Sequence, residues 1–241
     1  MLKKLKRIID GILPPRCLMC GSVVNSDNSL CNECFSKINF VSRPYCKHCG
    51  MPFYKSIDNE DALCIHCLNP KNNDKFRMLR FGVEYDEFSK KIILDFKFLD
   101  HLENRKLLTN WLNIAGVDIF DAGVDLIIPV PLHFTRLLKR KYNQSAILAK
   151  ELSLLRDVEV DYKSLRRHKK TTPQVLCSGK ERLKNVKKAF EVVDIEKIKG
   201  KRIVLIDDVY TTGATLRECA SVLLKGGAKS VDALTIARVC S

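Results

Sequence analysis

Short apolar runs and helical repeats alternate along the chain from about Phe76 onward. Continuous short runs are typical of buried strands, whereas apolar residues at i, i+3 and i+4 predict helices. The predicted strands are residues 80–86, 124–130, 202–207 and 230–239, and the predicted helices are residues 87–98, 105–116, 143–155 and 213–225. Strands that alternate with helices indicate a parallel sheet covered on both faces, so the expected fold class is α/β.

The chain begins with apolar residues at helical spacing, set between lysine and arginine side chains. We predict an amphipathic helix over residues 1–16. Asp10, Gly11 and the Pro14–Pro15 pair interrupt the run before it reaches the length of a signal-peptide core or a membrane span. We therefore expect a cytoplasmic protein with no membrane span, whose first helix packs on a domain rather than on lipid.

Eight of the eleven cysteines lie in the next segment, over residues 17–67. They form four Cys-x-x-Cys pairs, which are Cys17/Cys20, Cys31/Cys34, Cys46/Cys49 and Cys64/Cys67. A two-residue gap lets both sulfurs of a pair turn toward one Zn²⁺ ion, and two pairs complete a closed structural site. Disulfides would require a secreted chain, and a redox pair would not recur four times. We predict a double zinc ribbon over residues 17–72, with two structural Zn²⁺ ions.

The order in which the cysteine pairs share a metal stays open on spacing alone. Sequential pairing gives two consecutive ribbons, and interleaved pairing gives a cross-braced module. We prefer sequential pairing because closing each short loop costs little chain entropy. His48 and His66 lie inside two of the pairs and could replace a thiolate, but we expect them to be exposed. The other cysteines, Cys177, Cys219 and Cys240, are expected to be plain thiols.

Two adjacent acids, Asp207 and Asp208, follow the apolar run 203–206, and a short loop then leads into a predicted helix. In parallel sheets, ligands bind at the carboxyl ends of the strands. Backbone N–H groups at a helix N-terminus bind anions, and Gly213 lets the backbone approach a phosphate closely. The two carboxylates can hold the vicinal hydroxyls of a ribose, directly or through Mg²⁺. Together these features predict a ribose 5-phosphate site.

The segment KRIVLIDDVYTTGATL at residues 201–216 resembles the 5-phosphoribosyl-1-pyrophosphate (PRPP) motif of type I phosphoribosyltransferases. Residues 128–144 and 165–190 extend the match. With four cysteine pairs in front, the whole chain resembles the ComF family of ComFC-like competence proteins. The resemblance implies a type I phosphoribosyltransferase fold over residues 76–241. The family usually has glycine where this chain has Lys141, which predicts a less flexible or more anion-binding loop.

The resemblance also implies roles for individual residues. Asp207 and Asp208 would hold the ribose and Mg²⁺ of PRPP. The 5′-phosphate would lie on the loop formed by Val209, Tyr210, Thr211, Thr212, Gly213, Ala214 and Thr215. The pyrophosphate would face Val130, Pro131, Arg136 and Arg140. Residues 166–174 would belong to a hood over the acceptor, and His133 would either shape its loop or contact the ligand.

The net charge of the chain is +14, from 42 Lys and Arg against 28 Asp and Glu. Residues 136–188 alone hold 16 Lys and Arg against 5 Asp and Glu, which favours a polyanionic partner over a uniformly solvated surface. Single-stranded DNA binds to cationic tracks with stacking rings. The candidate contacts are Lys139, Arg140, Lys141, Tyr142, Arg166, Arg167, Lys169, Lys170 and Arg182. Aromatic residues make up only 7% of the chain, so phosphate contacts should dominate.

Two functions are consistent with these features. The first is a PRPP-binding protein that handles single-stranded DNA in natural transformation, as the resemblance implies, with other DNA-uptake proteins as possible partners. The second is an active phosphoribosyltransferase that transfers the phosphoribosyl group of PRPP to an unknown amine or nucleobase. The sequence identifies no base that would activate the acceptor, although an amine could react without one. We favour the first function, with a working PRPP pocket.

Overall fold

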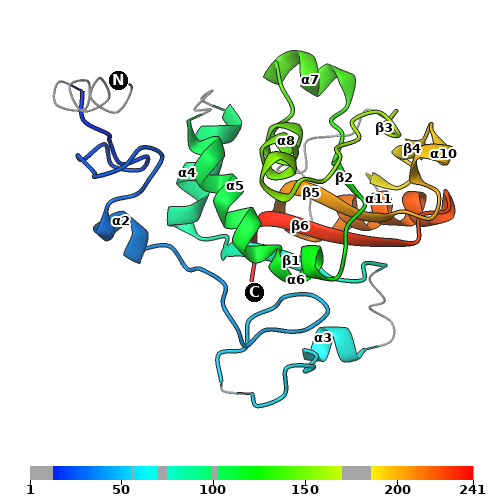
Figure 1. Ribbon diagram of the computed structural model, residues 1–241, viewed down its shortest axis with the longest axis horizontal. Helices are drawn as coiled ribbons and strands as arrows, with labels where there is room; N and C mark the ends of the chain where they lie inside the picture. The colour runs from blue at the N-terminus through cyan, green and yellow to red at the C-terminus, as the bar shows by residue number, and fades with distance from the viewer. Residues whose placement is uncertain (1–12, 56, 70–74, 99–102, 170–185, 241) are drawn as a thin grey trace.

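A parallel sheet lies at the centre of the computed structural model, which describes residues 13–55, 57–69, 75–98, 103–169 and 186–240 (Figure 1). Its strands are β1 (Leu79–Glu84), β2 (Leu126–Pro129), β5 (Arg202–Tyr210) and β6 (Ser230–Arg238). They are ordered β1-β6-β5-β2, and every neighbouring pair is parallel. This arrangement confirms the α/β fold that the alternating sequence pattern predicts.

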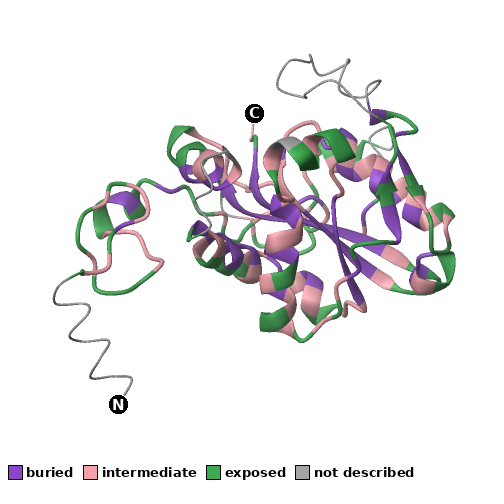
Figure 2. Cartoon of the chain, turned by 90° about the horizontal axis from the view of Figure 1, so that it is seen from above, coloured by how far each residue is buried: buried purple, intermediate pink, exposed green. Residues whose placement is uncertain are grey.

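Helices cover both faces of the sheet. The helices α4 (Glu87–Phe98), α5 (Asn104–Ala115) and α8 (Gln144–Arg156) pack on one face, and α11 (Ala214–Lys225) packs on the other. Side chains of β5 alternate between the two cores, with Ile203 and Leu205 on the α11 side and Val204 and Ile206 on the opposite side. The strands in the middle of Figure 2 are largely buried, which explains why runs such as residues 203–206 of β5 are continuously apolar rather than alternating.

Shorter elements join these layers. They are α6 (Val117–Asp121), α7 (Phe134–Arg140), α10 (Ile195–Ile198) and an antiparallel hairpin of β3 (Leu165–Arg167) with β4 (Phe190–Val192). Leu165 and Phe190 of this hairpin join the same core as α11. Arg166 and Arg167 of the hairpin line a cavity together with Leu137 of α7 and Ala146 of α8, so the hairpin lies beside these two helices.

The cysteine-rich segment contains two short helices, α2 (Asn32–Ser36) and α3 (Ile65–Leu68). Between the two halves of the segment, Phe40 forms a bridge with Val83 at the edge of β1, and the Val41 N–H donates to Gly82 O at 3.0 Å. Residues 1–12 of the predicted first helix lie outside the described residues. The expectation that this helix reaches residue 16 is wrong, because Arg16 instead forms an antiparallel bridge with Val23.

Candidate functional site

The eight cysteines of the N-terminal segment gather into two groups in chain order. The first cluster is Cys17, Cys20, Cys31 and Cys34, and the second cluster is Cys46, Cys49, Cys64 and Cys67. Within each cluster all four Sγ atoms lie within 4.8 Å of one another. The structure therefore agrees with sequential rather than interleaved pairing.

The electrostatics of the second cluster fit a divalent cation. The backbone N–H of Cys64 donates to Cys46 Sγ at 3.3 Å. A hydrogen bond from the Cys49 side chain is the main reason that the pKa of Cys46 falls to about 4, whereas the pKa of Cys49 is raised by the same bond and by burial. Four thiolates this close repel one another, and Zn²⁺ compensates their charge. With all four ligands supplied by cysteine, Zn²⁺ here would be structural.

The knuckle of the second cluster, residues 46–50, packs against β1. The Leu79 N–H donates to His48 O at 2.8 Å, and His48 Nε2 lies 2.9 Å from Phe76 O. His48 is consequently half-buried, so the expectation that it is exposed is wrong, while His66 is exposed as expected. At Gly50 (φ +68°) an added Cβ would lie 2.7 Å from Leu79 O, so the close approach requires glycine.

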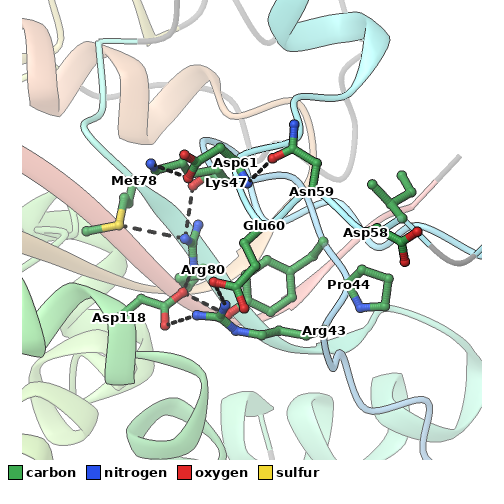
Figure 3. A pocket seen from close by; sticks show the side chains of 12 residues that line it. Arg43, Pro44, Lys47, Asp58, Asn59, Glu60, Asp61, Met78, Arg80 and Asp118 are labelled. Carbon is green, nitrogen blue, oxygen red and sulfur yellow. Dashed lines mark hydrogen bonds and ion pairs between the residues drawn. The ribbon is translucent and has the colours of Figure 1, made fainter.

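Arg80 ties this ribbon to the sheet from the other side of the knuckle. Its guanidinium donates to Lys47 O at 2.9 Å and to Asp118 Oδ2 at 3.1 Å. Arg43 also pairs with Asp118, so two arginines converge on one carboxylate of α6 (Figure 3). A cavity of about 520 Å³ lies beside them. The cations and acids that Figure 3 shows there largely satisfy one another, which indicates a structural junction.

The acid pair lies inside β5 rather than after it. The strand continues to Tyr210 because β6 runs alongside, with Tyr210 opposite Arg238. Asp207 accepts a hydrogen bond from Ser145 of α8 at 3.1 Å, and Asp208 forms an ion pair with Lys97 of α4. The apolar run predicted a strand that ends at residue 207, because the sequence does not show how far the neighbouring strand extends.

The pKa values of the two carboxyl groups are shifted in opposite directions. Burial and the charge of Asp208 raise the pKa of Asp207 to about 7. Burial also opposes ionisation of Asp208, but the charge and hydrogen bond of Lys97 outweigh it and lower the pKa of Asp208. The site therefore holds one anionic carboxylate and one that ionises near neutral pH.

Lys97 is a site residue that the sequence analysis missed. It belongs to the last turn of α4, and the N-terminal region of α8 holds that turn in place. Tyr142 donates its hydroxyl to Phe96 O at 3.0 Å, and the Gln144 amide donates to Lys97 O at 3.0 Å. No sequence spacing links residue 97 to residue 208, so only the packing of α4 against α8 could reveal the pair.

The predicted phosphate loop runs from β5 into α11. Gly213 adopts φ +71° as the N-cap of α11, and an added Cβ there would lie 2.2 Å from the Tyr210 hydroxyl oxygen. Arg217 of α11, also missed in the sequence, donates to Thr212 O, and its Nη2 lies 3.4 Å from the Tyr210 hydroxyl oxygen. The fold of the loop thus depends on Gly213 and on the buried Tyr210 ring.

The predicted pyrophosphate loop follows β2. His133 caps α7 by accepting from the Thr135 N–H at 3.3 Å, so it shapes the loop. Asn143 donates to Val130 O at 3.0 Å and caps α8. Lys141, where the resemblance implies glycine, has φ +66°. A side chain in this left-handed region is strained, so glycine would fit the position better.

Comparison with known proteins matches two separate parts of the chain to known domain families. Residues 8–68 match the double zinc ribbon domain family, and residues 143–240 match the phosphoribosyl transferase domain family. Competence protein F from Haemophilus influenzae is 33% identical over 230 residues, which cover 92% of this chain and 96% of that protein. The chain belongs to the competence protein F (ComF) family.

Other relatives of this ComF chain extend over nearly the same length. DNA utilization protein YhgH from Escherichia coli K12 is 28% identical over 94% of this chain and 98% of its own. Competence protein ComFC from Bacillus subtilis is 27% identical over 95% and 97%. Among solved structures, the chain is similar to glutamine PRPP amidotransferase from B. subtilis, at 18% identity and a TM-score of 0.39, over 63% of this chain and 33% of that one.

The ComF chain thus combines a type I phosphoribosyltransferase fold with an N-terminal double zinc ribbon. Over the described part of the chain, no helix has both the length and the apolar character needed to cross a bilayer.

The basic residues of the ComF chain that were expected to contact DNA differ in their exposure and in their surroundings. Arg166, Lys169 and Lys141 are exposed, whereas Arg167 is 6% exposed and lies with its guanidinium 5.3 Å from the centroid of the Phe190 ring. Burial and the like charge of Arg136 lower the pKa of Arg167 to about 10. Arg140 is close enough to the acid pair for its charge to help lower the pKa of Asp208. Lys170 and Arg182 lie outside the described residues, and Lys139 lies within α7.

A second cavity, of about 540 Å³, connects the pyrophosphate loop to the hairpin. Pro129 and Pro131 line it on the loop side, and Arg166 and Arg167 line it on the hairpin side. Tyr162 and Lys163, both exposed, complete its rim. The cavity therefore offers apolar walls and a cationic edge within reach of the predicted pyrophosphate site.

Proposed function

We propose that this chain binds PRPP at the carboxyl end of its sheet and acts on single-stranded DNA in natural transformation. The observation that carries the PRPP assignment is the position of Asp207 and Asp208, which directly precede a glycine-dependent loop at the start of α11. Loop N–H groups suit a 5′-phosphate, and adjacent carboxylates suit the hydroxyls of the ribose.

The remaining contacts of PRPP follow from the neighbouring elements. Arg136 and Arg140 of α7 lie close enough to the hairpin and the acid pair, respectively, to affect the pKa of Arg167 and of Asp208. We propose that they face the pyrophosphate, whose charge guanidinium groups bind well.

The acid pair fits Mg²⁺, which prefers oxygen ligands and usually arrives bound to phosphates. Asp208, kept anionic by Lys97, and Asp207, which ionises near neutral pH, would hold the ion. Bound Mg²⁺ would neutralise negative charge on the pyrophosphate.

The role in DNA handling rests on the relatives and on the placement of cations. The names of three relatives refer to competence or DNA utilization, and this chain aligns with each over more than nine-tenths of its length. Lys163, Arg166 and Lys169 are exposed cations around β3, and two of them line the 540 Å³ cavity. We propose that phosphates of a single strand bind along this edge.

Titration calorimetry with PRPP and Mg²⁺ tests the first part. The parent should bind PRPP, and Asp207→Asn with Asp208→Asn should abolish binding while circular dichroism shows a folded protein. Asp121→Asn, which neutralises an exposed acid of α6, is the matched control and should bind as the parent does. Equal PRPP affinity in the folded double variant would refute the site.

A second candidate function is phosphoribosyl transfer to an acceptor. The 540 Å³ cavity favours it, because an apolar space beside the pyrophosphate loop suits a nucleobase or an amine. Pyrophosphate release from PRPP, measured across a panel of bases and amines, distinguishes the functions. Turnover with one acceptor would establish an enzyme, whereas PRPP binding without turnover favours the binding protein.

A further inference from the structure

Arg238, the last residue of β6, lies between the second cluster and the phosphate loop. It is 7% exposed, and its Nη1 donates to Cys49 O at 2.6 Å. Its guanidinium carbon lies 4.9 Å from the centroid of the Tyr210 ring and 5.4 Å from that of the Phe81 ring. A single buried cation thus touches both the backbone of a cysteine ligand and an aromatic residue of the loop.

Tyr210 carries this contact onward to the loop. Its neighbour in β6 is Arg238 itself, and the Val239 N–H donates to Tyr210 O at 3.0 Å. At the other end of the side chain, the hydroxyl lies so close to Gly213 that no Cβ fits between them. Any displacement of the Tyr210 ring therefore moves the turn that is proposed to hold the 5′-phosphate.

The first cluster reaches the domain differently. Lys91 of α4 donates to Met19 O at 3.0 Å in the first ribbon, so this ribbon contacts the helix that carries Lys97 rather than the strand that carries Arg238. In Figure 1 the first ribbon lies beside α4, and the second lies below the sheet next to the end of β6. The two clusters therefore differ in their connection to the loop.

We propose that Arg238 is a positioning residue that couples the second cluster to the phosphate loop, so that Zn²⁺ at this cluster and PRPP at the loop strengthen each other's binding. This inference rests on the proposed binding of PRPP. Its physical basis is that small cysteine ribbons owe their fold to the metal. When the metal is lost, the knuckle at residues 46–50 is released from its fixed shape, and Arg238 loses the Cys49 carbonyl that orients it.

Thermodynamic linkage makes this coupling reciprocal. If the metal-bound knuckle favours the binding form of the loop, PRPP must favour the metal-bound knuckle by the same factor, which for coupled sites is typically about 5- to 150-fold. PRPP should therefore slow the loss of metal from the second cluster. It should also slow amide exchange where the knuckle is hydrogen-bonded, at Gly50 and at Leu79.

The experiment uses the full-length zinc-loaded protein. Hydrogen exchange and zinc transfer to a chromogenic chelator are followed with and without PRPP and Mg²⁺. In the parent, we expect PRPP to slow exchange at residues 46–50 and Leu79, and release of one of the two zinc ions, by about fivefold or more. Arg238→Met fills the space between the rings without donating to Cys49 O, so it should lose this protection and bind PRPP about tenfold more weakly.

Two further variants separate the inference from general damage. Arg43→Met removes another arginine that ties the second ribbon to the domain, through its 3.0 Å bond to Asp118, and should keep the PRPP protection. Arg238→Lys retains a cation that can donate to Cys49 O but loses the planar stack, so we expect partial protection. This variant also serves as the test if Arg238→Met fails to fold.

The outcomes are distinct. If the parent does not bind PRPP, the proposed function fails and this inference fails with it. If the parent binds PRPP but exchange and zinc release are unchanged, the coupling is refuted while PRPP binding stands. Parent-like affinity and protection in a folded Arg238 variant would also refute it.

Discussion

Lys97 and Asp208 form an ion pair across the carboxyl edge of the sheet, joining the last turn of α4 to β5. The pair is largely buried, with side chains 21% and 14% exposed, and it keeps Asp208 anionic against the effect of burial. Ion pairs at such a depth have a large desolvation cost, so this one is better explained by the charge state it sets than by stability.

Replacing Lys97 by Met should weaken PRPP binding. Without the ammonium group the pKa of Asp208 rises, and the two carboxyl groups share a proton near neutral pH. We expect an affinity loss of about tenfold at pH 7, equivalent to roughly one pKa unit, and partial recovery at higher pH. Titration calorimetry at pH 7 and 8.5 measures both.

Lys90→Met, on the exposed face of the same helix, controls for loss of a lysine from α4. It should bind as the parent does at both pH values. If Lys97→Met also matched the parent, Lys97 would have no part in setting the charge of the site.

Asp207 should make the stability of the chain depend on pH. Its pKa is about 7 in the folded protein and about 3.9 in an unfolded chain. Its contribution to stability is therefore fully present below about pH 3.9 and is lost as the pH rises through about 7. Asp207→Asn removes that loss, so the variant should melt at a higher temperature than the parent at pH 8, by less as the pH falls toward 5.

PRPP binding should respond to the same titration in the opposite sense. The ionised carboxylate accepts hydrogen bonds from the ribose hydroxyl groups, so the affinity of the parent for PRPP should increase from pH 6 to pH 8. The phosphates of PRPP also titrate and contribute to the pH dependence of the affinity. The Asp207→Asn variant should keep the contribution of the phosphates and lose the contribution of Asp207. A steep pH dependence that persists unchanged in the variant would mean that another group is responsible.

The sequence revealed the parts of the site that lie next to one another in the chain. An apolar run extends from Ile203 to Ile206, and the two acids follow it directly. Gly213 comes shortly after the acids in the chain, so the strand, the acids and the loop were predictable. Lys97 and Arg238 were not, because each reaches the site from an element whose packing the sequence does not specify.

The hairpin shows a different kind of limit. Arg166 and Arg167 look alike in a run of basic residues, yet strand β3 turns one outward and the other into the core. The twofold alternation of a strand separates such neighbours, but three residues are too few for that period to be recognised. The predicted DNA contacts therefore included a cation that the fold buries.

Replacing Lys141 by glycine should stabilise the protein. It has φ +66° directly after α7, a conformation that costs a residue with a Cβ roughly 1 kcal/mol or more. Lys141→Gly should therefore stabilise the protein by about 0.5–1 kcal/mol in chemical denaturation, after the extra flexibility of glycine is deducted. Lys150→Gly, at an exposed position inside α8, should instead destabilise it by about 1 kcal/mol. Destabilisation by both variants would contradict the prediction.

The last prediction concerns the exposed cations Lys163, Arg166 and Lys169. If they contact phosphates of single-stranded DNA, each contact releases counterions and contributes about −0.7 to the log–log slope of affinity against salt. Replacing all three by Ala should weaken binding and flatten the slope by up to roughly 2. Fluorescence anisotropy with a labelled oligonucleotide at several salt concentrations measures both quantities. Lys199, Lys225 and Lys229 are also exposed, and they lie near the amino ends of β5 and β6, so their triple Ala variant has the same net charge without the predicted contacts. An equal loss in the two variants would show that only net charge matters, and no loss in the first would remove the β3 edge from the DNA surface.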